Sequence, residues 1–404
     1  MHIGIIGGGA SGMAAAIEAA KKESIQVTVI ERQARVGRKL QATGNGRCNL
    51  TNLNAQAGGY FGDYPQFARP ALEAYSVEQT LEWFRSLGLY TVAEESGRVY
   101  PYSDQANSVV DVLRFALNRN NIRLLSGMEV TSVKKVDGKF RVDTGGEVLT
   151  FDRVIVACGG LAGSKLGGSM AGYKLLRSLG HHCTRLRPSL VQLKSGWNGC
   201  VSLKGVRANC HVKLMRDGSL FAESTGELQF TEYGLSGPVI FEISRDACSD
   251  SASWSCQLDF FPDMDRKTLL EELEHRRHRS ISVEELLTGI LHNRLGRVLT
   301  AAAGIRMSGN ADALTLSQLE AVADAVKSFE ICLNGTMGMD HAQVTAGGIL
   351  TEEFDPATME SRLVPGLYAC GEVLDIDGAC GGYNLQWAWS SGRLAGQSAG
   401  GDGL

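Results

Sequence analysis

Three glycines near the N-terminus are spaced for contact with the phosphates of a dinucleotide. Gly7, Gly9 and Gly12 satisfy G-x-G-x-x-G between an apolar, strand-like run at 2–6 and an alanine-rich, helix-like segment. The first glycine allows a tight turn, the second lets a pyrophosphate approach the backbone, and the third lets the helix pack on the strand. The N-terminal end of that helix directs its partial positive charge at the phosphates.

An acidic residue closes the second predicted strand. The segment QVTVIE at 26–31 ends at Glu31, whose carboxylate can accept hydrogen bonds from ribose hydroxyls. A carboxylate there disfavours the 2′-phosphate of NADP. Strand, glycines, helix, strand and acid occur in the expected order, so the sequence predicts a site for FAD or NAD.

A polar, glycine-rich loop follows this unit where an NAD dehydrogenase would continue with regular βαβ units. The stretch GRKLQATGNGRCNLTN at 37–52 opens with Arg38 and Lys39, which are placed to meet phosphate charge. Its glycines and asparagines are typical of a loop whose own backbone contacts a ligand. The alternative is a solvated surface loop.

Two later segments favour FAD. RVIVACGG at 153–160 is an apolar strand ending in paired glycines, and 366–396 holds a strand, then Gly371-Glu372, then Gly381-Gly382, then a helix. In doubly wound flavoproteins, a late strand followed by glycine and an acid places a carboxylate near the ribityl chain. The next helix then directs its N-terminus at the N1–C2=O region of the flavin. Both ends of the chain are therefore expected to fold around one FAD.

Composition sets the broad class. The chain has 404 residues, a net charge of −4, and ten cysteines without a C-x-x-C pair. This length predicts two or three domains, and the charge gives no general attraction to nucleic acid or to anionic membranes. No run of about 18 apolar residues occurs, and no cysteine–histidine spacing fits zinc. We expect a cytoplasmic protein with a small-molecule substrate, no metal, no nucleic-acid partner and no membrane span.

The middle of the chain changes character twice. Residues 190–262 hold short β-rich runs, with a turn at Gly237-Pro238, and residues 263–327 read as three helices. The predicted helices cover 266–280, 283–295 and a segment from Leu316. The last carries an apolar face that predicts core packing: Leu316, Leu319, Val322, Ala323 and Val326. The basic cluster 275–279 follows EELE, so it reads as a solvated helix end.

Four motifs together resemble the BaiN/YhiN-type flavoproteins, which are named NAD(P)/FAD-dependent oxidoreductases or aminoacetone oxidase family FAD-binding enzymes. They are the loop at 37–52, FTEYGLSGP at 230–238, AQVTAGGI at 342–349 and PGLYACGEVLDIDGACGGYNLQWAWSSG at 365–392. The resemblance covers essentially the whole chain. It implies an α/β fold: a Rossmann-like split FAD-binding domain, an inserted β-barrel-like domain and a small helical domain. The implied boundaries are 1–189 with 344–404, 190–262 with 328–343, and 263–327.

The resemblance also implies which residues contact FAD. The pyrophosphate is assigned Gly7, Gly9, Ala10, Ser11 and Gly12, with Arg38 and Lys39 on the phosphate side, and the adenosine ribose is assigned Glu31 and Arg32. The flavin face is assigned Asn45, Gly46, Arg47, Cys48 and Asn49, and adenine is assigned the backbone of Val130, in a strand-like segment. The ribityl chain and pyrimidine edge are assigned Gly371, Glu372, Asn384, Leu385 and Gln386. Gly159 and Gly382, in the two later glycine pairs, complete the set.

Two positions depart from the family pattern. Members usually read FTHxGLSGP, whereas Glu232 stands at the histidine position here, and Ala379-Cys380 replaces a frequent Tyr-Thr pair. If these positions line the substrate pocket, the substrate or its protonation partner differs from that of relatives. No catalytic residue is assigned, and the pocket candidates are Cys48, Asn49, Glu232, Tyr233, Cys380 and Tyr383.

These patterns predict an FAD-dependent oxidoreductase that transfers hydride between a small or polycyclic organic substrate and flavin N5. NAD(P)H, oxygen or a carrier protein would recycle the flavin. The sequence shows one complete dinucleotide site, so NAD(P)H would visit transiently. The alternatives are a flavin-dependent nucleic-acid (tRNA) modifying enzyme and a non-catalytic flavin redox sensor.

Overall fold

The computed structural model describes residues 1–55 and 58–401, which form two compact units. The first unit combines Met1–Arg187 with Gln343–Leu404, and the second is Pro188–Ala342. The two ends of the polypeptide therefore belong to one compact unit. The helical segment belongs to the same compact unit as the strands around it, and the finer division into three domains stays a prediction.

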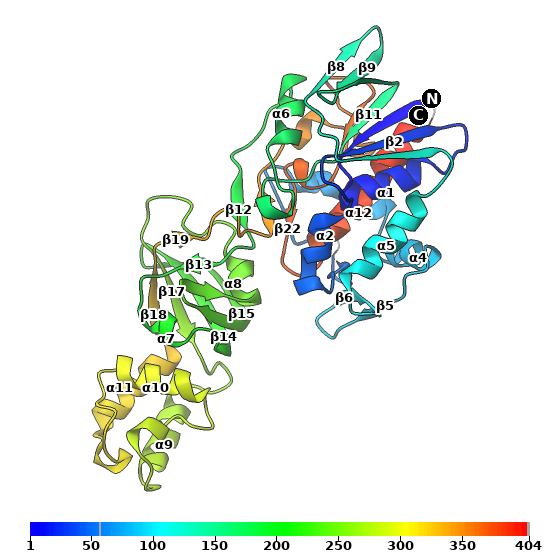
Figure 1. The fold of residues 1–404 in the computed structure, drawn as a ribbon. Coiled ribbons are helices and arrows are strands. Elements are labelled where there is room, and N and C mark those ends of the chain that lie inside the picture. Colours follow the sequence, from blue (N-terminus) through cyan, green and yellow to red (C-terminus); the bar gives the residue numbers. More distant parts are fainter. Residues whose placement is uncertain (56–57, 402–404) are drawn as a thin grey trace. The chain divides into compact units, whose positions relative to one another are not determined.

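A parallel five-stranded sheet forms the centre of the first unit (Figure 1). Its strand order β21-β11-β1-β2-β7 places a strand from the C-terminal segment next to strands from the N-terminal one. Ile3 faces Arg153 on one side and Val27 on the other. The strands are β1 (His2–Ile6), β2 (Gln26–Glu31), β7 (Ile122–Ser126), β11 (Arg153–Val156) and β21 (Leu367–Ala369). The observed α/β class with a Rossmann-like parallel sheet confirms the predicted fold class.

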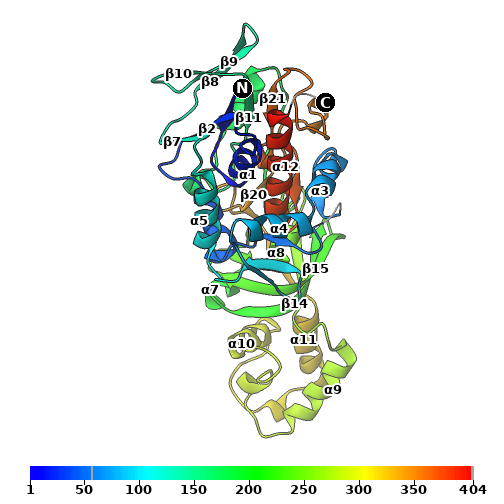
Figure 2. The same ribbon diagram turned by 90° about the vertical axis from the view of Figure 1, so that its right-hand side faces the viewer.

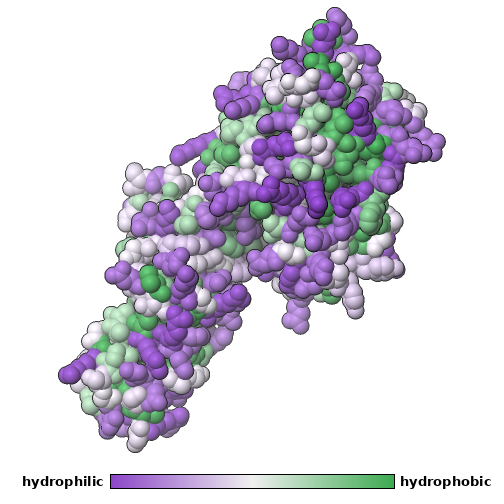
Figure 3. All heavy atoms as spheres, viewed as in Figure 1, coloured by the Kyte–Doolittle hydropathy of each residue, from purple (hydrophilic) through white to green (hydrophobic). Residues whose placement is uncertain are grey.

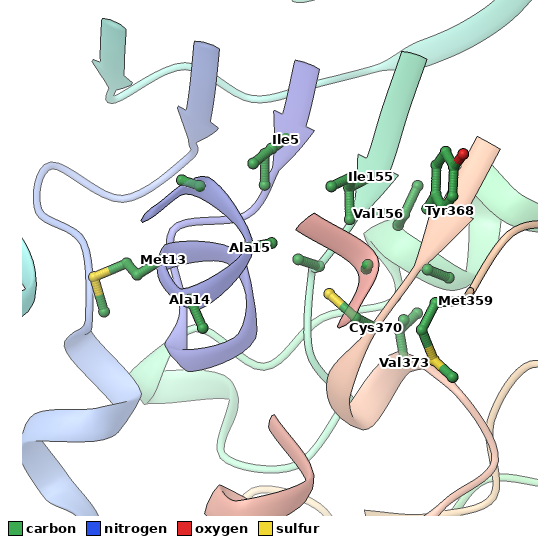
Figure 4. Packing of buried hydrophobic residues seen from close by; sticks show 14 of the residues in the cluster. Ile5, Met13, Ala14, Ala15, Ile155, Val156, Met359, Tyr368, Cys370 and Val373 are labelled. Carbon is green, nitrogen blue, oxygen red and sulfur yellow. The ribbon is translucent and has the colours of Figure 1, made fainter. Parts of the chain in front are cut away.

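Helices α1 (Ala10–Ala19) and α12 (Tyr383–Gly400) pack against each other on this sheet. Figure 4 shows alanine side chains of α1 beside Ile5 and Ile155, which project from β1 and β11. Ile5, Ile155 and Ala15 are completely buried. Side chains without polar atoms thus fill the layer between helix and sheet, which is where burial contributes most to stability.

An antiparallel meander packs near the same strands. β8 (Ser132–Val136), β9 (Lys139–Asp143) and β10 (Val148–Phe151) form it. The ring of Phe151 lies so close to Gly4 that a Cβ at Gly4 would come within 2.6 Å of it. The remaining elements of this unit are α2 (Arg38–Ala42), β3 (Thr51–Asn52), β4 (Tyr60–Phe61), α3 (Arg69–Ala74), α4 (Val77–Ser86), β5 (Thr91–Ala93), β6 (Arg98–Pro101), α5 (Ala106–Leu117), α6 (Ala171–Ser178), β20 (Val344–Ala346) and β22 (Asp377–Gly378).

A seven-stranded antiparallel sheet builds the second unit (Figure 2). Its order is β18-β17-β14-β15-β16-β13-β19, and only Asn334 separates the two outermost strands in sequence. The sheet must therefore curl until its edges meet. Strand β12 (Arg187–Ser189) lies where the chain passes from the first unit into the second. The other elements are β13 (Leu193–Lys194), α7 (Gly199–Ser202), β14 (Arg207–Arg216), β15 (Ser219–Thr231), β16 (Gly234–Ser236), α8 (Pro238–Ile243), β17 (Trp254–Asp259), β18 (Phe329–Leu333) and β19 (Gly335–Thr336).

The helical segment differs from the sequence prediction at two points. Its helices are α9 (Arg266–Arg277), α10 (Asn293–Ala302) and α11 (Leu316–Lys327). The predicted helix at 283–295 is wrong: a short 3-10 turn ends at Glu285, and Gly289, with φ +84°, breaks the path before His292 caps α10. Leu316, assigned to the apolar face, is 53% exposed because it lies in the first turn of α11, whereas Leu319 and Val322 are buried.

Hydrophilic residues cover most of the face seen in Figure 3, with hydrophobic patches between them. Within residues 1–55 and 58–401, no helix has the length and apolar character needed to cross a bilayer. The same residues contain no group of three or more His, Cys, Asp or Glu side chains placed to hold a metal ion.

Candidate cofactor and active site

The glycine-rich turn has the geometry that its sequence predicts. A Cβ at Gly7 (φ +111°) would lie 2.4 Å from the carbonyl oxygen of Ala157, and one at Gly12 would lie 1.9 Å from that of Gly7. Nothing lies within 4 Å of the Cβ position of Gly9. Gly9 also caps α1 without any side-chain hydrogen bond, so the N-terminus of the helix keeps its main-chain donors for an anion.

Glu31 holds this turn in place. One carboxylate oxygen accepts a hydrogen bond from the Gly8 N–H at 2.7 Å, and the other accepts from the Gln33 N–H at 2.7 Å. The carboxylate therefore lies beside the turn, with remaining lone pairs for the ribose contact that stays a prediction. Arg32, assigned to the same ribose, donates to the carbonyl of Gly167 at 2.8 Å.

Val130, assigned to adenine through its backbone, is buried but does not lie in a strand. The expected strand is interrupted because Gly127 (φ +77°) turns the chain after β7, and β8 begins only at Ser132. Gly159 follows β11 in a left-handed conformation, φ +69°, with open space around its Cβ position.

The loop after α2 is held in an unusual backbone conformation. Gly44, Asn45, Gly46 and Cys48 have φ values of 57°, 56°, 86° and 62°. Asparagine and cysteine rarely adopt such angles, and residues held in this way cluster at ligand sites. Arg47 anchors the loop, because its guanidinium lies 4.0 Å from the centre of the Tyr100 ring and pairs with Glu94 and Asp104. The positive charge of Arg47 is thus offset by the carboxylates of Glu94 and Asp104.

The side chain of Asn49 ends beside the N-terminus of α12. A Cβ at Gly382 would lie 3.0 Å from Asn49 Oδ1, and Gly382 caps α12 without a side-chain hydrogen bond. Among the residues that the structure describes, this buried Oδ1 has no hydrogen-bond partner. A buried carbonyl without a donor is costly, so a ligand that supplies an N–H would satisfy it.

Cys48 is completely buried, and burial raises the pKa of its thiol to about 12. A thiolate is therefore disfavoured, and Cys48 fills space beside the loop. Tyr383 and Cys380 flank the start of α12, where the Tyr383 ring meets the edge of Tyr60 at 5.9 Å between centroids. Tyr60 donates its hydroxyl to the Tyr383 carbonyl at 3.2 Å.

Three consecutive residues in the first turn of α12 have different environments. The side-chain amide of Asn384 donates to the Gly378 carbonyl at 2.7 Å and accepts from the Gly378 N–H at 2.8 Å. Leu385 packs against the core of the first unit. Gln386 is completely buried, and its amide contacts Thr51 and Thr80. The Gln386 side chain therefore completes an interior network, and contact of this residue with the flavin stays a prediction.

Glu372 follows β21 and receives two donors. Lys39 Nζ lies 2.8 Å from one carboxylate oxygen, and the Thr345 N–H donates to the other at 2.9 Å. Gly371 lies against Ser11, at the start of α1. Sequence reasoning missed Thr345, although it lies in the motif at 342–349. Arg38 is turned away and donates to Gln33 at 2.7 Å.

Glu232 and Tyr233 belong to the second unit. They form the turn between β15 and β16, where Glu232 is exposed and pairs with Lys204 at 2.5 Å. The Tyr233 carbonyl accepts from the Ser195 N–H at 3.0 Å. Of the pocket candidates, Asn49 and Tyr383 lie at the start of α12, Cys380 shortly precedes this helix in sequence, Cys48 lies in the loop after α2, and Glu232 and Tyr233 belong to the second unit.

The first unit fits an FAD molecule. The N-termini of α1 and α12 lack side-chain caps, and the glycine-rich turn has open space at Gly9. Among the described residues, no donor binds the side-chain carbonyl of Asn49. Both helices begin at a glycine: Gly9 has open space at its Cβ position among the described residues, whereas Gly382 packs against the Thr51 main chain. Phosphates suit the first helix, and the N1–C2=O edge of the isoalloxazine, with its adjacent N–H, suits the second.

Comparison with known proteins gives the family. Residues 1–398 match the family described as HI0933-like protein Rossmann domain. A 3-dehydro-bile acid delta(4,6)-reductase from Clostridium scindens is 42% identical over 98% of this chain and 98% of its own length. A ribosomal RNA dihydrouridine synthase from Escherichia coli is 33% identical over 96% and 95%.

Among solved structures, 3-ketosteroid-delta4-(5alpha)-dehydrogenase from Rhodococcus jostii RHA1 is similar at 16% identity and a TM-score of 0.49, covering 99% of this chain and 96% of that one. The family match over nearly the whole chain and the two relatives above 30% identity agree with the motifs and the fold. The chain belongs to the HI0933-like Rossmann family, the BaiN/YhiN-type FAD-dependent oxidoreductases.

Proposed function

We propose that this protein reduces a C=C bond conjugated to a carbonyl group in a polycyclic organic substrate. The observation that carries the proposal is the 42% identity, over nearly the full length of both chains, to a 3-dehydro-bile acid delta(4,6)-reductase. That name describes reduction of double bonds in a ring system that also bears an oxo group. The names of both curated relatives describe saturation of a ring double bond.

Bound FAD supplies a hydride from N5 in its reduced form. A proton must add to the other carbon, so that the C=C bond becomes a C–C bond with two new C–H bonds. NAD(P)H, oxidised to NAD(P)⁺, is the proposed source of the hydride that the flavin passes on.

The chain's own residues orient the flavin and supply the proton. Asn49 and the N-terminus of α12 would fix the pyrimidine edge of the flavin, since both present polar main-chain or amide groups at one place. Tyr383, in the first turn of that helix, is the candidate proton donor. Its ring is braced by the edge contact with Tyr60, which holds the side chain at the start of α12.

An anaerobic stopped-flow experiment tests this proposal. Protein loaded with FAD is mixed with NADH or NADPH while flavin absorbance is followed, and a 3-oxo-Δ4,6 steroid is then added. We expect bleaching by one nicotinamide cofactor and reoxidation by the dienone, but not by its saturated analogue. Tyr383→Phe should slow the reoxidation step and leave flavin reduction unchanged. Absence of reoxidation by any conjugated ketone would contradict the proposal.

A second candidate, reduction of uridine in ribosomal RNA, is favoured by the 33% identity to a ribosomal RNA dihydrouridine synthase. The charge pattern does not add to it. In the basic segment of α9, Arg276 pairs with Glu272 and Arg277 with Glu274, so acids within the protein offset both charges. Incubation of the reduced protein with unmodified ribosomal RNA, followed by dihydrouridine analysis, separates the two candidates.

A further inference from the structure

Lys39 and Glu372 form an ion pair across the first unit. Their charged atoms lie 2.8 Å apart, and 333 positions separate the two residues in sequence. Lys39 lies on α2, and Glu372 lies in the short turn that follows β21. The side chains are 30% and 19% exposed, so solvent screens the pair only in part.

Both partners are anchored at the phosphate-binding turn. The N–H of Gly37, which caps α2, donates to the Gly8 carbonyl at 2.9 Å. A Cβ at Gly371 would lie 2.6 Å from Ser11 Oγ, in the first turn of α1. The Glu372 carboxylate is therefore held close to the place where the anionic diphosphate of FAD is expected, and an uncompensated negative charge there would repel it.

The carboxylate has little room to move away. A Cβ at Gly160 would come within 2.4 Å of a Glu372 carboxylate oxygen, and the Thr345 N–H donates to that same oxygen. Burial, and after it the nearby charge of Glu372, raises the pKa of Tyr173, a completely buried residue of α6. Lys39 supplies the opposite charge, whereas the neighbouring Arg38 binds Gln33.

We propose that Lys39 is a positioning residue that acts on FAD binding through Glu372, by neutralising a carboxylate that would otherwise repel the diphosphate. This differs from the sequence-based expectation that Lys39 contacts phosphate directly. The inference rests on FAD as the cofactor and not on the proposed substrate, and its test measures binding without turnover.

A double-mutant cycle tests the inference. The full-length protein is stripped of flavin, and FAD affinity is measured by fluorescence titration for wild type, Lys39→Met, Glu372→Gln and the double variant. We expect Lys39→Met to raise the Kd for FAD about tenfold, whereas the double variant returns to within about threefold of Glu372→Gln. A double variant as weak as Lys39→Met would overturn the inference, because Lys39 would then act on the phosphate itself.

Recovery of affinity in the double variant is a readout that loss of folding would not produce, because a second destabilising substitution cannot restore FAD binding. Lys139→Met is the matched control. It removes a lysine of β9 whose Nζ lies 3.3 Å from a carboxylate oxygen of Asp152, and it should leave the affinity for FAD unchanged. Melting temperatures confirm that each variant is folded.

Discussion

The main chain of Ser11 in α1 lies directly against Gly392 in α12. A Cβ at Gly392 would fall 2.4 Å from the Ser11 carbonyl oxygen, and one at Gly396 would fall 2.3 Å from that of Ala15. At Gly400, the nearest atom is the end of the Ile25 side chain, at 3.2 Å. The two helices that present their N-termini to the cofactor site are thus joined along glycines spaced four residues apart.

This contact predicts different effects for the same substitution along one helix. Gly392→Ala and Gly396→Ala should each lower the free energy of unfolding by about 1 to 3 kcal/mol, because backbone must move to admit the methyl group. Gly400→Ala should change it little, since the strain there is slight and alanine gains about 1 kcal/mol of helix propensity. Urea denaturation checks the series. Equal effects at all three positions would contradict the packing argument.

Asn49 and Asn52 should respond oppositely to replacement by alanine in the flavin-free protein. Asn49 Oδ1 is buried without a partner, so Asn49→Ala should leave thermal stability unchanged or raise it, while the Kd for FAD rises about tenfold. Asn52 donates to the Gly381 carbonyl at 2.9 Å and accepts from the Asn54 N–H at 2.9 Å. Asn52→Ala should therefore lower the melting temperature without flavin. Loss of stability in Asn49→Ala would show that its carbonyl is already satisfied.

Glu31→Ala should affect both the turn and the cofactor. It removes the acceptors of the Gly8 and Gln33 amides, which should cost about 1 to 3 kcal/mol in the flavin-free protein. FAD affinity should fall as well, because the turn that meets the pyrophosphate loosens. Glu31→Gln keeps one acceptor oxygen and should give intermediate values. Thermal melts and FAD titrations report the two effects separately, and an unaltered melt would argue against the structural role of Glu31.

His181 makes stability depend on pH. Its side chain is completely buried, with Nδ1 2.8 Å from Glu353 and Nε2 3.0 Å from the Ser361 hydroxyl. Burial lowers the pKa of His181 below 6.5, although Glu353 opposes this shift. Between pH 6.5 and the lower folded value, the unfolded chain binds the proton and the folded chain does not. Stability is therefore retained above pH 6.5 and falls as the pH drops through that window.

The predicted contribution of His181 is a slope of up to about 1.4 kcal/mol per pH unit in that window. His181→Gln should remove this part of the slope in urea denaturation measured from pH 5 to 7. His278→Gln replaces an exposed histidine and should leave the slope unchanged. An identical pH profile in wild type and His181→Gln would refute the assignment.

The features that the sequence predicted well are local ones. Gly7 and Gly12 lie in a turn and a helix start that neighbouring residues define, so the need for glycine there could be predicted. The structure confirms that the main chain approaches both residues too closely for a side chain. The helix from Leu316 could be predicted because its apolar spacing lies within one contiguous segment. The residues given to the flavin through the family resemblance remain predictions, although many of them surround the same turn and helix N-termini.

The features that could not be predicted from the sequence depend on partners far away along the chain. Nothing in the sequence around Gln386 shows that Thr51 and Thr80, from another part of the chain, bind its side-chain amide. Lys39 looks like a phosphate ligand until Glu372 is placed beside it. The segment 283–295 has helical composition, but the left-handed Gly289 and the cap at His292 divide it. Periodicity within a segment cannot reveal such contacts.

The discontinuous first unit has a consequence for biosynthesis. α1 leaves the ribosome early, but its partner α12 is translated only after every residue of Pro188–Ala342. The inserted unit has its own core and can mature while the small-residue surface of α1 is still uncovered. A nascent chain stalled before Tyr383 would expose that surface to chaperones and proteases, so flavin capture should be a late event in the synthesis of the polypeptide.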